Sequence, residues 1–325
     1  GSVTEKGKIP FRTRLKVWWE GYDLNDVKRR LKEREEARAR ADAAAAPSPP
    51  RSADPVLPVE PWDSRRIEIA QFIWGEGYCG PGGPEHVIAM SKLLSLSPEM
   101  SAMVIGAGLG GPSRVLAQEF GVWITGFEES AALAQAGMEL SVRTGLAKKA
   151  EIRHYNPKAP EFDRNFDRAF AKEALFTIEH KSHLLRHVHK KLKDEGLFLM
   201  TDYFLSRESV VNHPDYLEWK TKEPERPHPV PAGEMLEILK AEGFSIRVNE
   251  DMTPQYVSMI SRAWAEADRV IAELMRQGEE GKQLVQVLLR EAELWNLRSR
   301  LLKANILQVH RILAAKKLPK TMSNW

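Results

Sequence analysis

A cluster of glycines followed by an acid is the part of this sequence with the clearest chemistry. Four glycines follow the apolar run 103–105: Gly106, Gly108, Gly110 and Gly111. Glycines let the backbone turn sharply and let a ligand approach where a Cβ would clash. Glu128 ends a second apolar run 22 residues after Gly106, close to the spacing of about 20 residues expected for an acid that binds ribose hydroxyls. The pattern predicts a nucleoside-binding strand–helix–strand unit.

The spacing inside this glycine loop fits two kinds of ligand. Gly106, Gly108 and Gly111 match the G-x-G-x-x-G pattern of dinucleotide sites, which would suit a nicotinamide-dependent oxidoreductase. Gly106, Gly108 and Gly110 match G-x-G-x-G, the loop of the class I S-adenosylmethionine-dependent methyltransferases. A third interpretation is a structural loop without a ligand. Pro112 suits the first turn of a helix but has no role in the nicotinamide interpretation.

Apolar periodicity predicts the elements that position these residues. Helices are predicted over 64–74, 84–94, 112–120, 131–144, 180–192, 232–242 and about 254–302, the last as one long helix or a pair. Strands are predicted over 103–105, 122–127, 150–154, 166–170, 197–201, 244–248 and 306–314. The alternation predicts an α/β fold with a doubly wound, Rossmann-like, seven-stranded and mostly parallel sheet.

In such sheets, ligands bind beyond the carboxyl ends of the strands. The residues expected around one crevice are those of the glycine loop together with Glu128, Asn156, Lys172, Glu173, Asp202 and Tyr203. The glycine-rich loop 74–87 precedes the first predicted sheet strand and is a candidate lid over the ligand.

The regions outside the sheet have distinct compositions. Residues 1–46 are predicted to form a helical N-terminal arm, 47–60 a proline-rich linker, and 61–325 the main domain. The arm suits a solvated helix docked on the main domain or a sister subunit, a membrane-surface anchor, or a docking arm for another protein. A homodimer, or a partner protein bound through the arm, is therefore a hypothesis. Residues 205–231 are proline-rich and polar, and are predicted to be an insertion rather than a core element.

The composition excludes some classes of protein. Lysine and arginine number 48 against 45 acidic residues, a net charge of +3, which does not indicate a nucleic-acid partner. A single cysteine, Cys79, excludes intrachain disulfides and suits a reducing, cytoplasmic compartment. No apolar run approaches the roughly 20 residues that span a bilayer. His183 and His187 have a chelating spacing, but a solvated helix face is the expected explanation and no metal site is predicted.

Five segments of the chain form an ordered set: FIWGEGYCGPGG, VIGAGLGGPS, TGFEES, NFDRAFAKEALFTI and LFLMTDYF. Together they resemble the class I S-adenosylmethionine-dependent methyltransferases, and within them the phosphoethanolamine methyltransferases and their small-amine and lipid-modifying relatives. The resemblance covers roughly residues 61–317 and excludes the arm. It implies S-adenosyl-L-methionine as the cofactor.

The resemblance also implies roles for individual residues. The expected cofactor-binding residues are Tyr78, Cys79, Gly80, Gly106, Ala107, Gly108, Gly110, Glu128, Glu129, Tyr155, Asn156 and Lys172. Tyr203 would face the methyl acceptor, and Trp62 could hold a cationic or apolar acceptor by its ring face. Glu173 is either a third acceptor-facing catalytic residue or an ordinary carboxylate at the start of a helix.

Three departures from this family affect the expected function. Val104 stands where the family has an acid at the start of the glycine motif. Trp62 and Thr177 stand where the phosphobase enzymes pair a tyrosine with a histidine. Because tryptophan cannot take a proton and threonine is a poor base, phosphoethanolamine methylation by that pair is not expected.

Methyl transfer asks little acid–base chemistry of a protein, since the sulfonium is already an activated electrophile and alignment supplies much of the acceleration. We therefore expect a methyltransferase acting on the nitrogen or carbon of a small-molecule or lipid-like acceptor. The alternative is a non-catalytic protein that keeps the fold as a partner or regulatory module. We expect Trp295 to belong to the core rather than to line a substrate tunnel. Arg298, Arg300 and Lys303 could hold a phosphate, but we expect them to form an exposed face.

Overall fold

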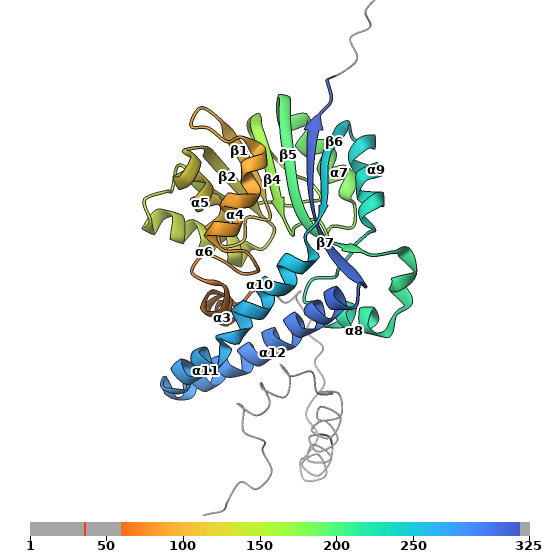
Figure 1. Ribbon diagram of the computed structural model, residues 1–325. Coiled ribbons are helices and arrows are strands. Elements are labelled where there is room, and N and C mark those ends of the chain that lie inside the picture. The colour runs from red at the N-terminus through yellow and green to blue at the C-terminus, as the bar shows by residue number, and fades with distance from the viewer. Residues whose placement is uncertain (1–35, 37–59, 319–325) are drawn as a thin grey trace, which may run out of the picture. The chain divides into compact units, whose positions relative to one another are not determined.

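The computed structural model describes residue 36 and residues 60–318. The predicted linker and nearly all of the predicted arm lie outside the described residues, so their roles stay predictions. Within the described residues, the strands form one seven-stranded sheet in the order β3-β2-β1-β4-β5-β7-β6 (Figure 1). Their bounds are β1 Ser101–Ile105, β2 Trp123–Glu128, β3 Ala150–His154, β4 Phe166–Lys172, β5 Leu192–Leu205, β6 Phe244–Asp251 and β7 Leu307–Lys316.

Five neighbouring strands of this sheet run parallel. β1 pairs with β2 and β4, β2 pairs with β3, and β4 pairs with β5. β7 is antiparallel to both of its neighbours, β5 and β6. The prediction of a seven-stranded, mostly parallel sheet is confirmed. The strand order reverses between β1 and β4, and such a reversal opens a crevice at the carboxyl ends of the strands.

Helices cover both faces of the sheet (Figure 1). The helices that come before β5 in the described chain are α3 Ser64–Trp74, α4 Pro84–Ser91, α5 Gly111–Phe120, α6 Ala131–Arg143 and α7 Lys181–Lys191. The later ones are α8 Pro214–Lys222, α9 Ala232–Ala241, α10 Thr253–Ala265, α11 Ala267–Met275 and α12 Gly278–Lys303, and short 3₁₀ turns span Lys92–Leu94 and Glu208–Asn212. No helix in the described ranges is both long and apolar enough to cross a membrane.

Strand β1 shows why the sheet is covered on both sides. Met103 and Ile105 join the core cluster that includes residues of α7 and α9. Ala102 and Val104 join the cluster that includes residues of α4 and α5. A strand buried on both faces needs a continuous apolar run, which is what residues 102–105 provide.

The C-terminal helices close over the carboxyl ends of the strands. The segment predicted as one long helix or a pair is three helices, α10 to α12. Helix α12 packs on α3: the rings of Trp74 and Trp295 meet edge to face with centroids 4.7 Å apart, and Arg66 forms an ion pair with Glu291. These contacts fix α12 beside the segment that leads into the glycine-rich loop.

The segment 205–231 was expected to lie outside the core, and this expectation is wrong. Helix α8 buries Trp219 completely and Tyr216 almost completely. The ring of Trp219 stacks on Phe176, with centroids 6.3 Å apart. Because Phe176 lies in the loop after β4, this packing brings residues 223–225 to the ligand edge of the sheet.

Candidate functional site

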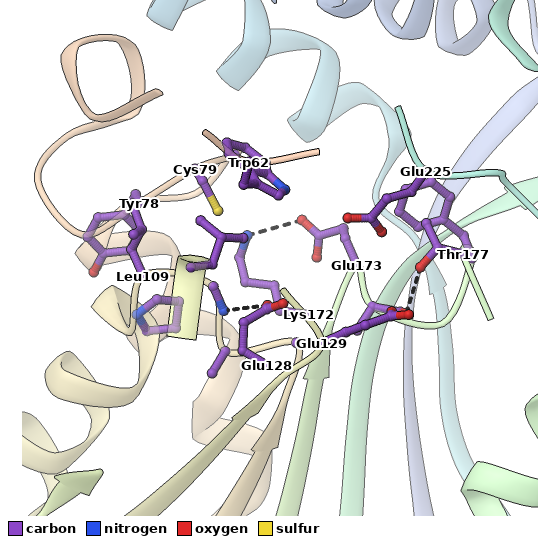
Figure 2. Close-up of a pocket in the computed structure, with 18 of the residues that line it drawn as sticks. Trp62, Tyr78, Cys79, Leu109, Glu128, Glu129, Lys172, Glu173, Thr177 and Glu225 are labelled. Carbon is purple, nitrogen blue, oxygen red and sulfur yellow. Dashed lines mark hydrogen bonds and ion pairs between the residues drawn. The ribbon is translucent and has the colours of Figure 1, made fainter. Parts of the chain in front are cut away.

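A cavity lies beyond the carboxyl ends of β1, β2, β4 and β5 (Figure 2). The predicted residues that line it are Trp62, Tyr78, Cys79, Gly80, Gly106, Ala107, Gly108, Glu128, Glu129, Tyr155, Lys172, Glu173, Thr177 and Tyr203. Gly110, Gly111, Asn156 and Asp202 were also predicted here, but none of them lines the cavity. Asp202 is buried and accepts hydrogen bonds from the backbone N–H groups of Leu175 and Tyr203. Gly110 instead precedes α5 in a left-handed conformation, and the side chain of Asn156 accepts a hydrogen bond from the backbone of Lys158.

The glycine loop can follow its path only without side chains. Gly106 has φ +73° and Gly108 has φ +55°, in the left-handed region. A Cβ on Gly106 would lie 2.4 Å from the Cβ of Ala174, and one on Gly108 would lie 3.1 Å from Cys79 Sγ. Both the conformation and the space therefore require glycine at Gly106. The loop leaves main-chain groups along the cavity wall.

Glu128 presents a buried carboxylate at the end of β2. It accepts hydrogen bonds from the backbone N–H of Gly108 at 3.0 Å and of Ser130 at 2.6 Å. Burial raises the pKa of Glu128 to about 7, and these two hydrogen bonds oppose the rise. Each carboxylate oxygen keeps a second lone pair, so the group can still accept from two hydroxyls of a ligand.

The glycine-rich loop before α4 is attached to the rest of the site through main-chain atoms. The carbonyl of Gly77 accepts from the N–H of Gly111 at 2.9 Å. The carbonyl of Pro81 accepts from Lys172 Nζ at 2.7 Å. Cys79 lies between these two contacts, and burial raises the pKa of its thiol to about 11. The loop therefore holds a neutral thiol against the glycine loop.

Lys172 and Glu173 follow β4 and are paired with each other. Lys172 Nζ lies 3.1 Å from Glu173 Oε1, as the dashed line in Figure 2 shows. The second carboxylate oxygen of Glu173 accepts a hydrogen bond from the Thr201 hydroxyl. Glu173 has φ +44°, an uncommon conformation for a residue with a Cβ and one often found at functional sites. Both oxygens of the predicted acceptor-facing acid are thus already engaged.

Trp62 lines the cavity, but one face of its ring is occupied by the chain itself. The Arg66 guanidinium lies over the ring, with its Cζ 3.7 Å from the ring centroid. Arg66 also donates to the carbonyl of Pro61 at 2.8 Å and pairs with Glu291. That ring face is therefore not open to an acceptor.

Two of the departures from the family lie at the cavity and one does not. Thr177 lines it, and its hydroxyl donates to the carbonyl of Ala174 at 3.4 Å. Trp62 lies on the same cavity. Val104 is 1% exposed and packs inside the core between β1 and the helices α4 and α5. Val104 therefore leaves no gap in the cavity wall.

The prediction of an exposed face at Arg298 is wrong. Arg298 is buried and forms an ion pair with Glu223. Its guanidinium carbon lies 4.5 Å from the ring centroid of Trp295, 5.3 Å from that of Tyr203 and 5.5 Å from that of Phe176. Trp295 is buried as expected, but it also lines the cavity. The sequence carries no signal for this cluster, since Glu223 and Arg298 are 75 positions apart.

Glu225 is a further lining residue that sequence reasoning missed. It follows α8 and is half-buried at the cavity. Burial raises the pKa of Glu225 to about 7, Glu129 adds to the rise, and Arg66 opposes it. The other missed lining residues are Arg66, Gly77, Pro81, Leu109, Pro112, Leu133, Ala174, Phe176, Glu223, Pro224, Trp295 and Arg298.

The histidines of α7 lie elsewhere. The rings of His183 and His187 meet with centroids 4.6 Å apart, and His187 Nδ1 contacts the carbonyl of His183. Across residues 60–318, no group of three or more histidine, cysteine or acidic side chains is arranged to hold a metal.

Known proteins resemble this chain in sequence and in fold. No family model matches. The chain is 29% identical over 192 residues to Phosphoethanolamine N-methyltransferase 3 of Arabidopsis thaliana, a match that covers 58% of this chain and only 38% of that relative. Its fold matches phosphoethanolamine N-methyltransferase 2 of Haemonchus contortus in complex with S-adenosyl-L-methionine, with TM-score 0.68, 20% identity and coverage of 78% and 57% of the two chains.

A second solved structure is similar in fold alone. It is a geranyl diphosphate C-methyltransferase from Streptomyces coelicolor, with TM-score 0.54, 15% identity and coverage of 78% of this chain and 99% of that one. The fold is the class I methyltransferase fold. The predicted resemblance to the phosphoethanolamine methyltransferase branch is confirmed at the level of sequence and of fold.

Proposed function

We propose that this chain transfers a methyl group from S-adenosyl-L-methionine to the nitrogen or carbon of a small-molecule or lipid-like acceptor. The observation that most supports this is the convergence of the glycine loop, Glu128 and the loop around Cys79 on one cavity. The Haemonchus contortus neighbour binds S-adenosyl-L-methionine. The Streptomyces coelicolor neighbour binds geranyl diphosphate, so the neighbours differ in their acceptors.

The residues present fit the cofactor. The carboxylate of Glu128 would accept from the ribose hydroxyls, and Tyr155 and Leu133 would border the adenosine. The main chain at Gly106 and Gly108 approaches the cavity without side chains. When bound, S-adenosyl-L-methionine supplies a methyl group already activated on a sulfonium. The protein then has to orient the acceptor in line with that methyl group and keep water away.

Two segments that border the cavity, the loop around Cys79 and helix α12, can keep water out of it. The loop around Cys79 is attached to the glycine loop and to Lys172 by hydrogen bonds. Helix α12 contributes Trp295 and Arg298 to the same cavity, and Trp295 lies beside Gly80 of that loop. A closed, water-poor site strengthens the electrostatic interactions that align the reactants.

Calorimetry with S-adenosyl-L-methionine and with its demethylated product tests the cofactor. We expect both to bind with one site per chain, and an absence of binding would contradict the proposed function. Transfer of label from methyl-labelled cofactor to metabolites of a cell extract tests the reaction.

A non-catalytic role is the second candidate, favoured by one feature of the site. Trp62 and Thr177 both line the cavity and neither is a base at neutral pH, while Glu173 is held by Lys172 and Thr201. Cofactor binding without any labelled product would support this second candidate. A homodimer or a partner protein bound through residues 1–46 stays a prediction.

A further inference from the structure

The basic side chains that line the cavity are all paired with carboxylates, whereas some of the lining carboxylates have no cationic partner among the described residues. Three basic residues line it, and each is paired with a carboxylate: Arg66 with Glu291, Lys172 with Glu173, and Arg298 with Glu223. An acceptor that carried a phosphate or carboxylate would therefore meet no unpaired cation among the lining residues that the structure describes. It would have to displace one of these carboxylates first, at a cost in desolvated charge.

Four of the aromatic rings that line the cavity are already in contact with the chain's own cations. Arg66 lies over Trp62. Arg298 lies over the rings of Trp295, Tyr203 and Phe176. A cationic acceptor held by an aromatic cage would have to replace these arginines. At these four rings a cation would have to displace an arginine, whereas an unpaired carboxylate could bind it directly.

Two carboxylates that line the cavity are unpaired among the described residues. Within residues 60–318, the carboxylates of Glu129 and Glu225 take part in no hydrogen bond or ion pair, although both line the cavity. Glu129 is exposed at the mouth, whereas Glu225 is half-buried. Figure 2 shows the Glu225 side chain on the side of the cavity where Glu173 and Thr177 lie, away from the glycine loop. A half-buried carboxylate without a partner is stabilised by a cation that binds beside it.

We propose that the acceptor is an amine without a phosphate or carboxylate group, and that Glu225 is the carboxylate that binds its ammonium form and takes its proton. This inference rests on the proposed methyltransferase function. Glu225 replaces Glu173 as the acceptor-facing acid, because the charge of Glu173 is already neutralised by its ion pair with Lys172, whereas Glu225 has no cationic partner among the described residues.

The step balances without any further reactant. The ammonium gives one N–H proton to the Glu225 carboxylate and becomes a neutral amine. The nitrogen lone pair forms the new N–C bond while the C–S bond breaks and its electron pair stays on sulfur. The products are a methylated ammonium, the neutral thioether and a protonated Glu225, which then releases its proton to solvent. A carboxyl whose pKa burial raises to about 7 accepts and releases a proton near neutral pH.

The experiment compares paired acceptors on wild type and on Glu225→Gln, with Glu208→Gln as the matched control, because Glu208 is an exposed acid of the same 205–231 segment. Ethanolamine and its N-methylated forms are paired with the corresponding phosphoethanolamines, and an apolar alkene serves as an acceptor at carbon. Release of the demethylated cofactor is measured for each. We expect the plain amines to have kcat/KM at least tenfold above their phosphorylated partners.

For Glu225→Gln we expect kcat/KM for amines to fall on the order of 100-fold, the typical contribution of a general base, while Glu208→Gln stays at the wild-type value. Calorimetry should show the demethylated cofactor binding to Glu225→Gln within about threefold of wild type. Preference for the phosphorylated or apolar acceptors, or no turnover of any amine by protein that binds the cofactor, would overturn the inference. An equal loss of cofactor binding in Glu225→Gln would overturn it too, since Glu225 would then serve the cofactor. Failure of wild type to bind the cofactor would instead contradict the proposed function itself.

Discussion

At the scale of single residues, Glu128 shows how hydrogen bonds can hold a buried carboxylate in the orientation that a ligand needs. Its carboxylate is desolvated, yet two backbone N–H groups donate to it. Those donors belong to the glycine loop and to the start of α6, so the same hydrogen bonds that fix the carboxylate also fix both loops. A ligand that adds hydroxyl donors completes a site that is already oriented.

Replacing Glu128 with glutamine should weaken binding of the demethylated cofactor by about 10- to 100-fold. The amide keeps the size of the side chain but loses one acceptor oxygen and the charge, and a hydrogen bond to a charged group contributes about 1.5–3 kcal/mol. Calorimetry checks this. Glu119→Gln, an exposed acid on α5, is the control and should bind as wild type does. Equal binding by Glu128→Gln would show that the ribose is held elsewhere.

Cys79 is expected to be an inert thiol. Burial raises its pKa to about 11, with the charge of Glu128 adding to the rise, so little thiolate exists at neutral pH. Iodoacetamide should alkylate the native protein on the order of 100-fold more slowly than a free cysteine at pH 7.5. Bound cofactor should slow it further, because Cys79 lines the cavity. Mass spectrometry reads the result directly from this single cysteine, with the urea-unfolded chain as control, and rapid native alkylation would contradict the expectation.

At the scale of elements, the site depends on three segments that are far apart in the chain. Helix α3 is joined to α12 through Trp74 and Trp295, and α12 is joined to the segment after α8 through Arg298 and Glu223. The result is a continuous set of contacts from the loop around Cys79 to Glu225. Substitutions that shift α12 should therefore alter the positions of both the loop around Cys79 and the segment that carries Glu225.

The Arg298–Glu223 pair should show strong coupling in a double-mutant cycle. Arg298→Met alone leaves Glu223 buried without its partner, and such a loss costs about 3–5 kcal/mol of unfolding free energy. Combining it with Glu223→Met should cost less than the sum of the single changes. Urea unfolding measures each variant. The exposed pair of Lys240 and Glu237 is the control, with an expected effect below about 1 kcal/mol, and additive effects for Arg298 and Glu223 would contradict the pairing.

The parts of the site that the sequence predicted are those built by neighbours along the chain. Gly106 and Glu128 belong to one strand–helix–strand unit, so their spacing alone brings them together. Arg298 and Glu225 were missed for a physical reason: a charged residue on a helix or in a polar segment is solvated unless tertiary packing buries it. That packing depends on Trp219 meeting Phe176, a contact that no local pattern in the chain indicates.

At the scale of the whole molecule, the buried acids link stability to pH. The pKa of Glu128 rises to about 7 on folding from an ordinary value of 4.5. Between these two values the folded protein holds a proton that the unfolded chain has released. The contribution of Glu128 to stability is therefore present at low pH and is lost as the pH rises toward 7. The pKa of Asp202 and of Glu225 also rises to about 7 through burial, so both act in the same direction.

The variant Glu128→Gln isolates this effect, because it keeps every other titrating group. Relative to wild type, its unfolding free energy should increase as the pH rises from about 5 to about 7.5. Urea unfolding at a series of pH values measures the difference, and Glu119→Gln should show none of this change. A difference that stays flat, or falls with rising pH, would show that Glu128 is ionised throughout that range.

The position of β7 has a consequence for how the molecule is made. β7 lies between β5 and β6, yet among the described strands it is the last that a ribosome would synthesise. Until Leu307–Lys316 emerges, β5 has an unpaired edge and β6 has no neighbour in the sheet. Unpaired strand edges favour association with other chains. We therefore expect the nascent chain to hold a nearly complete five-stranded parallel sheet that needs chaperone protection at one edge, and to become fully native only when its C-terminal strand inserts.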